Sequence, residues 1–213
     1  MKTILCFGDS NTWGANPVEK NRYSLQQRWP SVMHRDLGGE YLVIAEGQPG
    51  RTTVWQDPIE GGRAGIDALI PCLESHAPLD LVIILLGTND LKQRFSLTAT
   101  DIALGAQRLV GIVMTKNCGP FNSTPKVLLV APPPVLEFPG SWEPMKGSQL
   151  ISRDFGISYR KVSEQTKCDF FDAGSVVQSS PVDGFHWGPE GHLALGHALS
   201  VVCRHILEER QQE

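Results

Sequence analysis

The sequence has no excess of positive charge and no long apolar run. Lysine and arginine together number 19 and the acidic residues 23, which gives a formal net charge of -4. A weakly acidic chain is not attracted at long range to phosphate backbones or anionic lipid, so we expect no nucleic-acid partner and no membrane partner. No stretch approaches the roughly 18 to 20 apolar residues of a membrane-spanning helix, and the apolar part of Met1–Gly8 is too short for a secretory signal. We therefore expect a cytoplasmic protein.

Cysteine is scarce and its spacing is irregular. The five cysteines stand at positions 6, 72, 118, 168 and 203, and no two of them form a C-x-x-C pair. This pattern offers neither a zinc site nor a dithiol, and it favours reduced, mostly buried thiols. No metal ion and no cofactor is expected from it.

The remaining composition is that of a folded protein. Of the 213 residues, 41% are hydrophobic and 20% are charged. No Ser/Gly-rich linker, charge block, repeat or low-complexity tract divides the chain. Although the length allows one or two domains, the sequence predicts a single domain over residues 1–213.

Short apolar runs alternate with segments of helical period. Leu81–Leu86 is apolar at every position, which fits a strand covered by helices on both faces of a parallel sheet. Pro189 directly follows a glycine and is well placed to open a final helix. Alternating strands and helices predict an α/β fold, a three-layer sandwich with a five-stranded parallel sheet. The five expected strands are Thr3–Phe7, Tyr41–Ala45, Leu81–Leu86, Lys126–Ala131 and Cys168–Phe171. Apolar stripes of helical period include Ile66, Leu69, Ile70 and Leu73; Ile102, Ala106, Leu109, Val110 and Val113; Ile151, Phe155, Tyr159 and Val162; and Leu195, Leu199, Val202 and Ile206.

Three irregular stretches lie between these elements, at Asp9–Ser24, Gly87–Thr100 and Pro132–Gln149. The first two follow strands directly. The third is long enough to be either a pocket wall or a missed element, and we favour the wall. Ligands of open α/β sheets bind beyond the carboxyl ends of the strands, where these loops would meet.

A nucleophile and its base stand at opposite ends of the sequence. Ser10 follows the first strand in the turn Gly8–Asn11, where its hydroxyl can point out of the sheet. A nucleophilic serine needs a base and a third group that orients the base. Asp183 and His186 lie three residues apart in a glycine-containing loop before the last helix, which lets the carboxylate fold back onto the imidazole. Surface positions are the expectation for the other five histidines: His34, His76, His192, His197 and His205.

Acyl transfer also needs hydrogen-bond donors aimed at the developing oxyanion. Two candidates follow predicted strands. Asn89 offers a side-chain N–H in the turn that ends the third strand, and Gly50 offers a sterically open backbone N–H after the second. Each alone is equally compatible with an ordinary turn.

Taken together, these motifs resemble the four blocks of the SGNH (GDSL-type) hydrolase superfamily, and more closely its bacterial arylesterase/acyltransferase branch. The blocks are Gly8–Ser10, Gly50, Gly87–Asp90 and Asp183–His186, in that order. The resemblance extends from Ile4 to the last helix. It implies a flavodoxin-like α/β/α sandwich. This chain departs from the pattern at one position, because many relatives have leucine where it has Asn11.

Roles for single residues follow from the resemblance. It implies that Ser10 is the nucleophile, His186 the general base and acid, and Asp183 the carboxylate that orients it. The backbone N–H groups of Ser10 and Gly50 and the side-chain amide of Asn89 would form the oxyanion hole. The implied activity is hydrolysis of short-chain carboxylic esters, with possible transfer of the acyl group to alcohols or peroxide. The resemblance also implies a homo-oligomer; aryl esters, acetylated sugars and lactones all fit as substrates.

Aromatic residues in the loops suggest where the substrate pocket is. Asn11 makes one flank of the expected pocket polar, and five large aromatic side chains fall in or beside the irregular stretches. Such side chains wall apolar pockets for acyl or aryl groups. With no lid domain, the chain leaves little room for a long lipid groove. The expected pocket aromatics are Trp13, Phe95, Phe138, Trp142 and Trp187.

Two other functions remain open. Asp9–Thr12 after an apolar strand is similar to the nucleophile turn of haloacid-dehalogenase-type phosphatases, in which Asp9 would help to hold Mg²⁺. That mechanism requires a carboxylate at position 11, where this chain has asparagine, and it gives His186 and Asn89 no role. A non-catalytic flavodoxin-like binding module is the third possibility, although no phosphate-binding glycine motif supports it.

Overall fold

The computed structural model describes residues 1–137 and 143–208, and it contains the expected parallel sheet. The five strands pair in parallel in the order β2-β1-β3-β4-β5. Both the α/β class and the strand number predicted from the sequence are confirmed. The strands are β1 (Lys2–Gly8), β2 (Tyr41–Gly47), β3 (Leu81–Leu85), β4 (Lys126–Ala131) and β5 (Asp169–Asp172).

The hydrophobic core lies on both faces of this sheet. Side chains of a strand alternate between faces, so Leu5 and Phe7 of β1 pack into one apolar cluster while Ile4 and Cys6 pack into the other. All five residues of β3 are buried, as its uninterrupted apolar run predicted. Burial of both faces requires a helical layer on each side.

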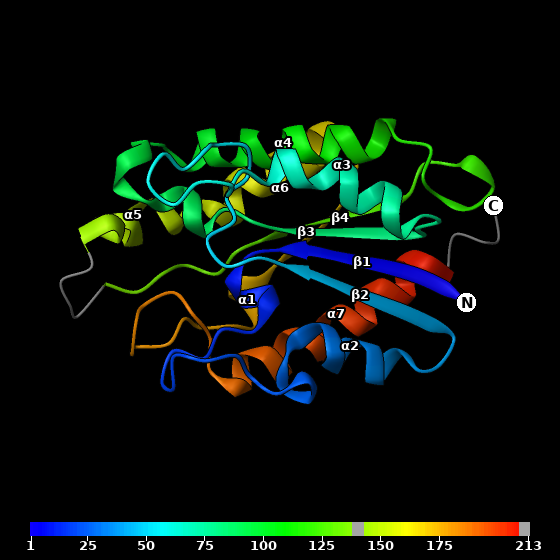
Figure 1. The fold of residues 1–213 in the computed structure, drawn as a ribbon, viewed down its shortest axis with the longest axis horizontal. Helices are drawn as coiled ribbons and strands as arrows, with labels where there is room; N and C mark the ends of the chain where they lie inside the picture. Colours follow the sequence, from blue (N-terminus) through cyan, green and yellow to red (C-terminus); the bar gives the residue numbers. More distant parts are fainter. Residues whose placement is uncertain (138–142, 209–213) are drawn as a thin grey trace.

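The two helical layers are visible in Figure 1. Helices α2 (Trp29–Leu37) and α7 (Pro189–Glu208) pack against each other on one face of the sheet. On the other face lie α3 (Gly65–His76), α4 (Ala99–Thr115) and α6 (Phe155–Thr166). None of the helices in the described ranges is long and apolar enough to cross a membrane.

The structure departs from the sequence prediction in the irregular stretches. The apolar stripe from Ile151 to Val162 belongs to two helices, α5 (Ser148–Ser152) and α6. The buried hydroxyl of Ser152, the last residue of α5, accepts a hydrogen bond of 3.0 Å from the backbone N–H of Val135, which ties α5 to the loop after β4. A contact between segments 17 residues apart leaves no periodic signal. The first stretch likewise contains a short helix at its start, Ser10–Trp13.

Glycine is required where β3 ends. Gly87 has φ +134°, which side chains rarely adopt, and a Cβ placed there would lie 2.2 Å from Oη of Tyr159. This hydroxyl donates a hydrogen bond of 2.7 Å to the carbonyl oxygen of Leu86. Gly87 therefore allows a buried tyrosine to hold the turn that carries Asn89.

Replacing Gly87 should destabilise the protein. We expect Gly87→Ala to lower the free energy of unfolding by about 2–4 kcal/mol, because it adds backbone strain to a clash with Tyr159. Gly111→Ala in α4 is the matched control, since a Cβ at Gly111 meets no atom within 4 Å. Thermal unfolding should show a clear fall in Tm for the first variant and none for the second. Equal Tm values would contradict the steric role of Gly87.

Candidate active site

The first polar turn after β1 forms the short helix α1 (Ser10–Trp13). The carboxylate of Asp9 caps this helix by accepting a hydrogen bond of 2.9 Å from the backbone N–H of Asn11. Ser10 is the first residue of the helix, so its backbone N–H has no acceptor within the helix and is open to a ligand. A Cβ at Gly8 would lie 2.0 Å from Oγ1 of Thr12, which explains why the turn begins with glycine.

The loop before α7 brings an imidazole to this serine. Nε2 of His186 lies 2.9 Å from Oγ of Ser10, and Nδ1 of His186 lies 2.6 Å from Oδ2 of Asp183. The structure thus joins residues 176 positions apart in one line of hydrogen bonds. The side chains of His186 and Asp183 are 17% and 19% exposed, so solvent can reach both of these groups.

Several hydrogen bonds hold the loop in place. The other carboxylate oxygen of Asp183 accepts from the backbone N–H groups of Phe185 and His186, at 3.2 and 2.9 Å. The loop is closed by a bond of 2.7 Å from the Ser180 N–H to the His186 carbonyl. Burial acts to raise the pKa of Asp183, but the bonds from His186 and the backbone outweigh it and lower that pKa. Asp183 is therefore held in its charged form beside the imidazole.

Asn11 joins α1 to the loop that carries His186. Its Nδ2 donates a hydrogen bond of 3.1 Å to the carbonyl oxygen of Phe185, the residue before His186. Asn11 is buried, and its Oδ1 has no hydrogen-bond partner among the described residues. Asn11, which the sequence predicts at a polar flank of the pocket, thus ties the residue after Ser10 to the residue before His186.

The loop after β2 presents Gly50 in a tight turn. The Arg51 N–H donates to the Gln48 carbonyl at 3.1 Å, and Gly50, which follows Pro49, has φ +80°. Proline followed by a residue of positive φ is the pattern of a type II turn. The hydrogen bond of the turn joins the Gln48 carbonyl to the Arg51 N–H, so the turn does not involve the N–H of Gly50.

Arg51 links three strand ends and was not found from the sequence. Its buried guanidinium donates to the carbonyl of Gly8 at 2.8 Å and also to the carbonyl of Glu46, and it lies 4.2 Å from the centre of the Phe7 ring. The carbonyl of Arg51 accepts a hydrogen bond of 3.1 Å from Nδ2 of Asn89. An amide nitrogen has two hydrogens, so Asn89 keeps a second N–H for a ligand. A single arginine has no periodic or motif signal, which is why it was missed.

A second buried bond joins the same two loops. The carboxylate of Asp90 accepts hydrogen bonds from the backbone N–H of Thr53, at 2.9 and 3.0 Å, and from the Thr53 hydroxyl at 2.5 Å. Burial raises the pKa of Asp90 to about 7, although the bonds from Thr53 act in the opposite direction. Asp90 therefore carries a buried carboxyl group that is costly to ionise.

Asp9 does not form the centre of a cation site in the described residues. Its Oδ1 caps α1, and burial raises its pKa to about 6 even though Asn11, His186 and Arg51 favour the charged form. No group of three or more His, Cys, Asp or Glu side chains in residues 1–137 and 143–208 is arranged to hold a metal ion. The phosphohydrolase alternative therefore gains no ligand set from these residues.

The expected pocket aromatics have different surroundings. Trp13 is half-buried, with the guanidinium of Arg22 at 4.7 Å from its ring centre, and Phe95 is also partly exposed. Trp187 is almost fully buried and belongs to the core cluster beside α7. Phe138 and Trp142 lie outside the described residues.

The expectation that His192 lies on the surface was wrong. His192 is fully buried in the first turn of α7, with its ring 5.2 Å from that of Tyr23 and 5.5 Å from that of Trp187. Neither ring nitrogen has a partner in the described part of the chain. Burial lowers the pKa of His192 to about 4, so the ring is neutral near pH 7. Tyr23 and Trp187 come from two loops, and their packing around His192 could not be predicted from the spacing of residues in the sequence.

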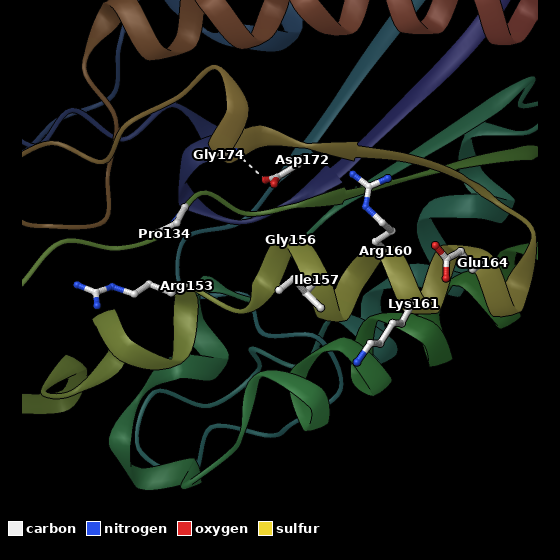
Figure 2. Close-up of a pocket in the computed structure, with 9 residues that line it drawn as sticks. All are labelled: Pro134, Arg153, Gly156, Ile157, Arg160, Lys161, Glu164, Asp172 and Gly174. Atoms are coloured by element: carbon white, nitrogen blue, oxygen red, sulfur yellow. Dashed lines mark hydrogen bonds between the residues drawn. The ribbon is translucent and has the colours of Figure 1, made fainter.

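A separate surface pocket of about 470 Å³ opens beside α6 (Figure 2). The side chains of Arg153 and Lys161 extend from its rim in different directions, and Asp172 lies against the start of α6. A Cβ at Gly156 would lie 2.6 Å from Oδ2 of Asp172, so glycine allows this carboxylate to approach the helix N-terminus. None of the predicted catalytic residues lines this pocket.

The chain is similar to known ester hydrolases in both sequence and structure. The family described as GDSL-like Lipase/Acylhydrolase matches residues 6–194. An aryl esterase of M. smegmatis is 41% identical with a TM-score of 0.93, and the match covers 97% of this chain and 100% of that one. A carbohydrate acetylesterase family member from Sinorhizobium meliloti is 39% identical with a TM-score of 0.93, covering 97% and 99%. A G-D-S-L family protein of Veillonella parvula, 15% identical with a TM-score of 0.69 over 96% and 100%, shares the fold. Among curated protein sequences none matches significantly.

The raised pKa of Asp90 predicts how stability changes with pH. The carboxyl group ionises near pH 3.8 in the unfolded chain and near 7 in the folded one, so the folded state binds more protons between these values and loses stability as pH rises through 7. We expect the Tm of the wild type to fall by a few degrees between pH 6.5 and 8, and that of Asp90→Asn to fall less. Asp9 and His192 are present in both proteins, so their titration cancels when the two Tm curves are compared. Parallel Tm curves for the two proteins would contradict the prediction.

Proposed function

The chain belongs to the GDSL-like lipase/acylhydrolase family of SGNH hydrolases and is a carboxylic ester hydrolase, and we propose that Ser10, His186 and Asp183 carry its reaction. The observation that carries the proposal is the unbroken line of hydrogen bonds between these three side chains. Carboxylate, imidazole and hydroxyl in that order are the parts that activate a serine as a nucleophile.

The reaction proceeds in two steps of acyl transfer. Neutral His186 accepts the proton of the Ser10 hydroxyl as its Oγ attacks the ester carbonyl carbon, and the carbonyl π electrons move onto the oxygen. The imidazolium then protonates the leaving alcohol as the tetrahedral intermediate collapses to an acyl-enzyme. Water attacks the acyl-enzyme by the same route, with His186 again as base. An alcohol or peroxide that reaches the acyl group would replace water and receive it.

Three donors stabilise the oxyanion. They are the backbone N–H of Ser10 at the start of α1, the N–H of Gly50 that its turn leaves unused, and the second side-chain N–H of Asn89. This arrangement is supported by the bond from Asn89 to the carbonyl of Arg51, which ties the amide to the residue after Gly50. Donors held in place before the reaction need no reorganisation when the charge develops, which is what makes them effective.

The proposed substrates are esters with a small acyl group. The relatives described as an aryl esterase and as a carbohydrate acetylesterase family member support a short acyl chain, with either an aryl or a sugar alcohol. The polar side chains beside Ser10, among them Asn11, favour a small acyl group over a long apolar one. Cytoplasmic location and self-association stay predictions from the sequence and from the family resemblance.

Serine dependence tests the catalytic proposal. On p-nitrophenyl acetate we expect Ser10→Ala to lower kcat by about a thousandfold or more, because removal of the nucleophile leaves only binding and the oxyanion hole. Ser75→Ala on the exposed end of α3 is the matched control and should leave kcat unchanged. A serine-directed sulfonyl fluoride should inactivate the wild type, and EDTA should have no effect. Activity that survives Ser10→Ala but is lost in EDTA would favour the phosphohydrolase alternative instead.

Chain length tests the proposed substrate class. We expect kcat/KM to be greatest for the acetate and butyrate esters of p-nitrophenol and at least tenfold lower for the decanoate, because a polar site cannot bury a long acyl chain. The measurement is initial rates on an ester series with Ser10→Ala as the blank. Faster turnover of the decanoate would show that an apolar groove receives the acyl group.

A further inference from the structure

A buried lysine in the loop of Asn89 contacts the loop of Gly50 and so joins the segments of two proposed oxyanion donors. Lys92 follows Asn89 by three residues and is only 1% exposed. Its Nζ lies 3.0 Å from Oδ2 of Asp57 and 2.5 Å from Oε1 of Glu60, both of which belong to the loop that carries Gly50. A single ammonium group thus joins the loop after β3 to the loop after β2.

Two arginines complete this group of charges. Arg94 lies 3.3 Å from Oδ1 of Asp57 and 3.4 Å from Oε1 of Glu60, and Nε of Arg63 lies 3.5 Å from Oε2 of Glu60. We call these five residues the Lys92 ion-pair cluster. Asp57 is fully buried, and burial acts to raise its pKa, but the bonds from Lys92 and from two backbone N–H groups lower it overall. The cluster therefore holds Asp57 in its charged form.

The cluster lies directly against a proposed oxyanion donor. A Cβ placed at Gly50 would lie 2.7 Å from Oε2 of Glu60 and 3.0 Å from Nε of Arg63. A carboxylate in contact with Gly50 would repel the negative oxygen that the Gly50 N–H binds, unless its charge were balanced. Lys92, Arg94 and Arg63 balance it, since three positive groups surround two negative ones.

We infer that Lys92 is a positioning residue for the oxyanion hole, joining the loop of Gly50 to the loop of Asn89 and neutralising Glu60 beside the developing negative charge. This inference rests on the proposed esterase function. Lys92 does not touch the reacting atoms; it acts through Glu60 and Asp57. Lys92 stabilises the transition state more than the bound ester, because the ester is neutral and negative charge develops only as its carbonyl becomes an oxyanion.

Lys92→Met removes the charge and keeps most of the side-chain volume. On p-nitrophenyl acetate we expect kcat to fall about tenfold or more while KM changes less than threefold, because the loss is confined to the charged transition state. Adding Glu60→Gln should restore at least a third of the lost kcat, since it removes the carboxylate that faces Gly50. A purely structural role would lower Tm without a charge-dependent recovery of kcat.

A milder variant covers the case in which Lys92→Met does not fold. Arg94 contacts the same two carboxylates from the edge of the cluster and is 22% exposed, so Arg94→Gln should remain folded. We expect its kcat to fall about threefold and to recover when Glu60→Gln is added. Lys116→Met is the matched control, because it breaks a 2.7 Å pair with Glu74 at the ends of α3 and α4 and should leave kcat unchanged.

The outcomes separate the two proposals. Ser10-dependent activity with unchanged kcat in the folded Lys92 and Arg94 variants would overturn the role of Lys92 and leave the esterase intact. A fall in kcat that Glu60→Gln does not reverse would likewise overturn it, in favour of a structural effect. Hydrolysis that does not depend on Ser10 would overturn the proposed function, and the inference with it.

Discussion

The loops after β1, β2 and β3 leave three neighbouring parallel strands at their carboxyl ends. The backbone of these loops cannot form the regular hydrogen bonds of a sheet, so its polar groups need other partners. The loops provide these partners largely for one another. The Arg51 side chain binds the carbonyl at the end of β1, its own carbonyl binds Asn89, and Asp90 binds Thr53. Because buried polar groups are costly unless paired, these bonds determine where the loops lie. The arrangement of Ser10, Gly50 and Asn89 is a consequence of that pairing.

Ionisable groups in this region are retained at a cost to stability. Asp9 and Asp90 are buried with raised pKa values, and Lys92 and Asp57 are buried as an ion pair. Apolar residues of similar size would often be at least as stable in such places. The charges lie where three loops meet around the proposed oxyanion hole. Hydrogen bonds and ion pairs fix the direction of each donor there, which apolar packing alone does not do.

Much of the fold was predictable because each strand and helix is encoded locally. The five strands and the helices α3, α4 and α7 were predicted from the apolar periods and from Pro189, and the family resemblance followed from four short motifs. What the sequence did not predict depends on contacts between distant segments. The position of α5 depends on a hydrogen bond from the Val135 N–H to the Ser152 hydroxyl, and the burial of His192 depends on Tyr23 and Trp187.

The sequence by itself determined which chemical groups stand at the ends of the strands: a serine after β1, a glycine after β2, an asparagine after β3 and an Asp/His pair before α7. The reason is that turn residues, capping residues and apolar periods act over a few positions. Only the tertiary structure decided that the imidazole lies 2.9 Å from the hydroxyl, and that Arg51, Asn11 and Lys92 join the loops around them. Those distances arise from the pairing of buried polar groups far apart in the chain, and no local pattern records such a pairing.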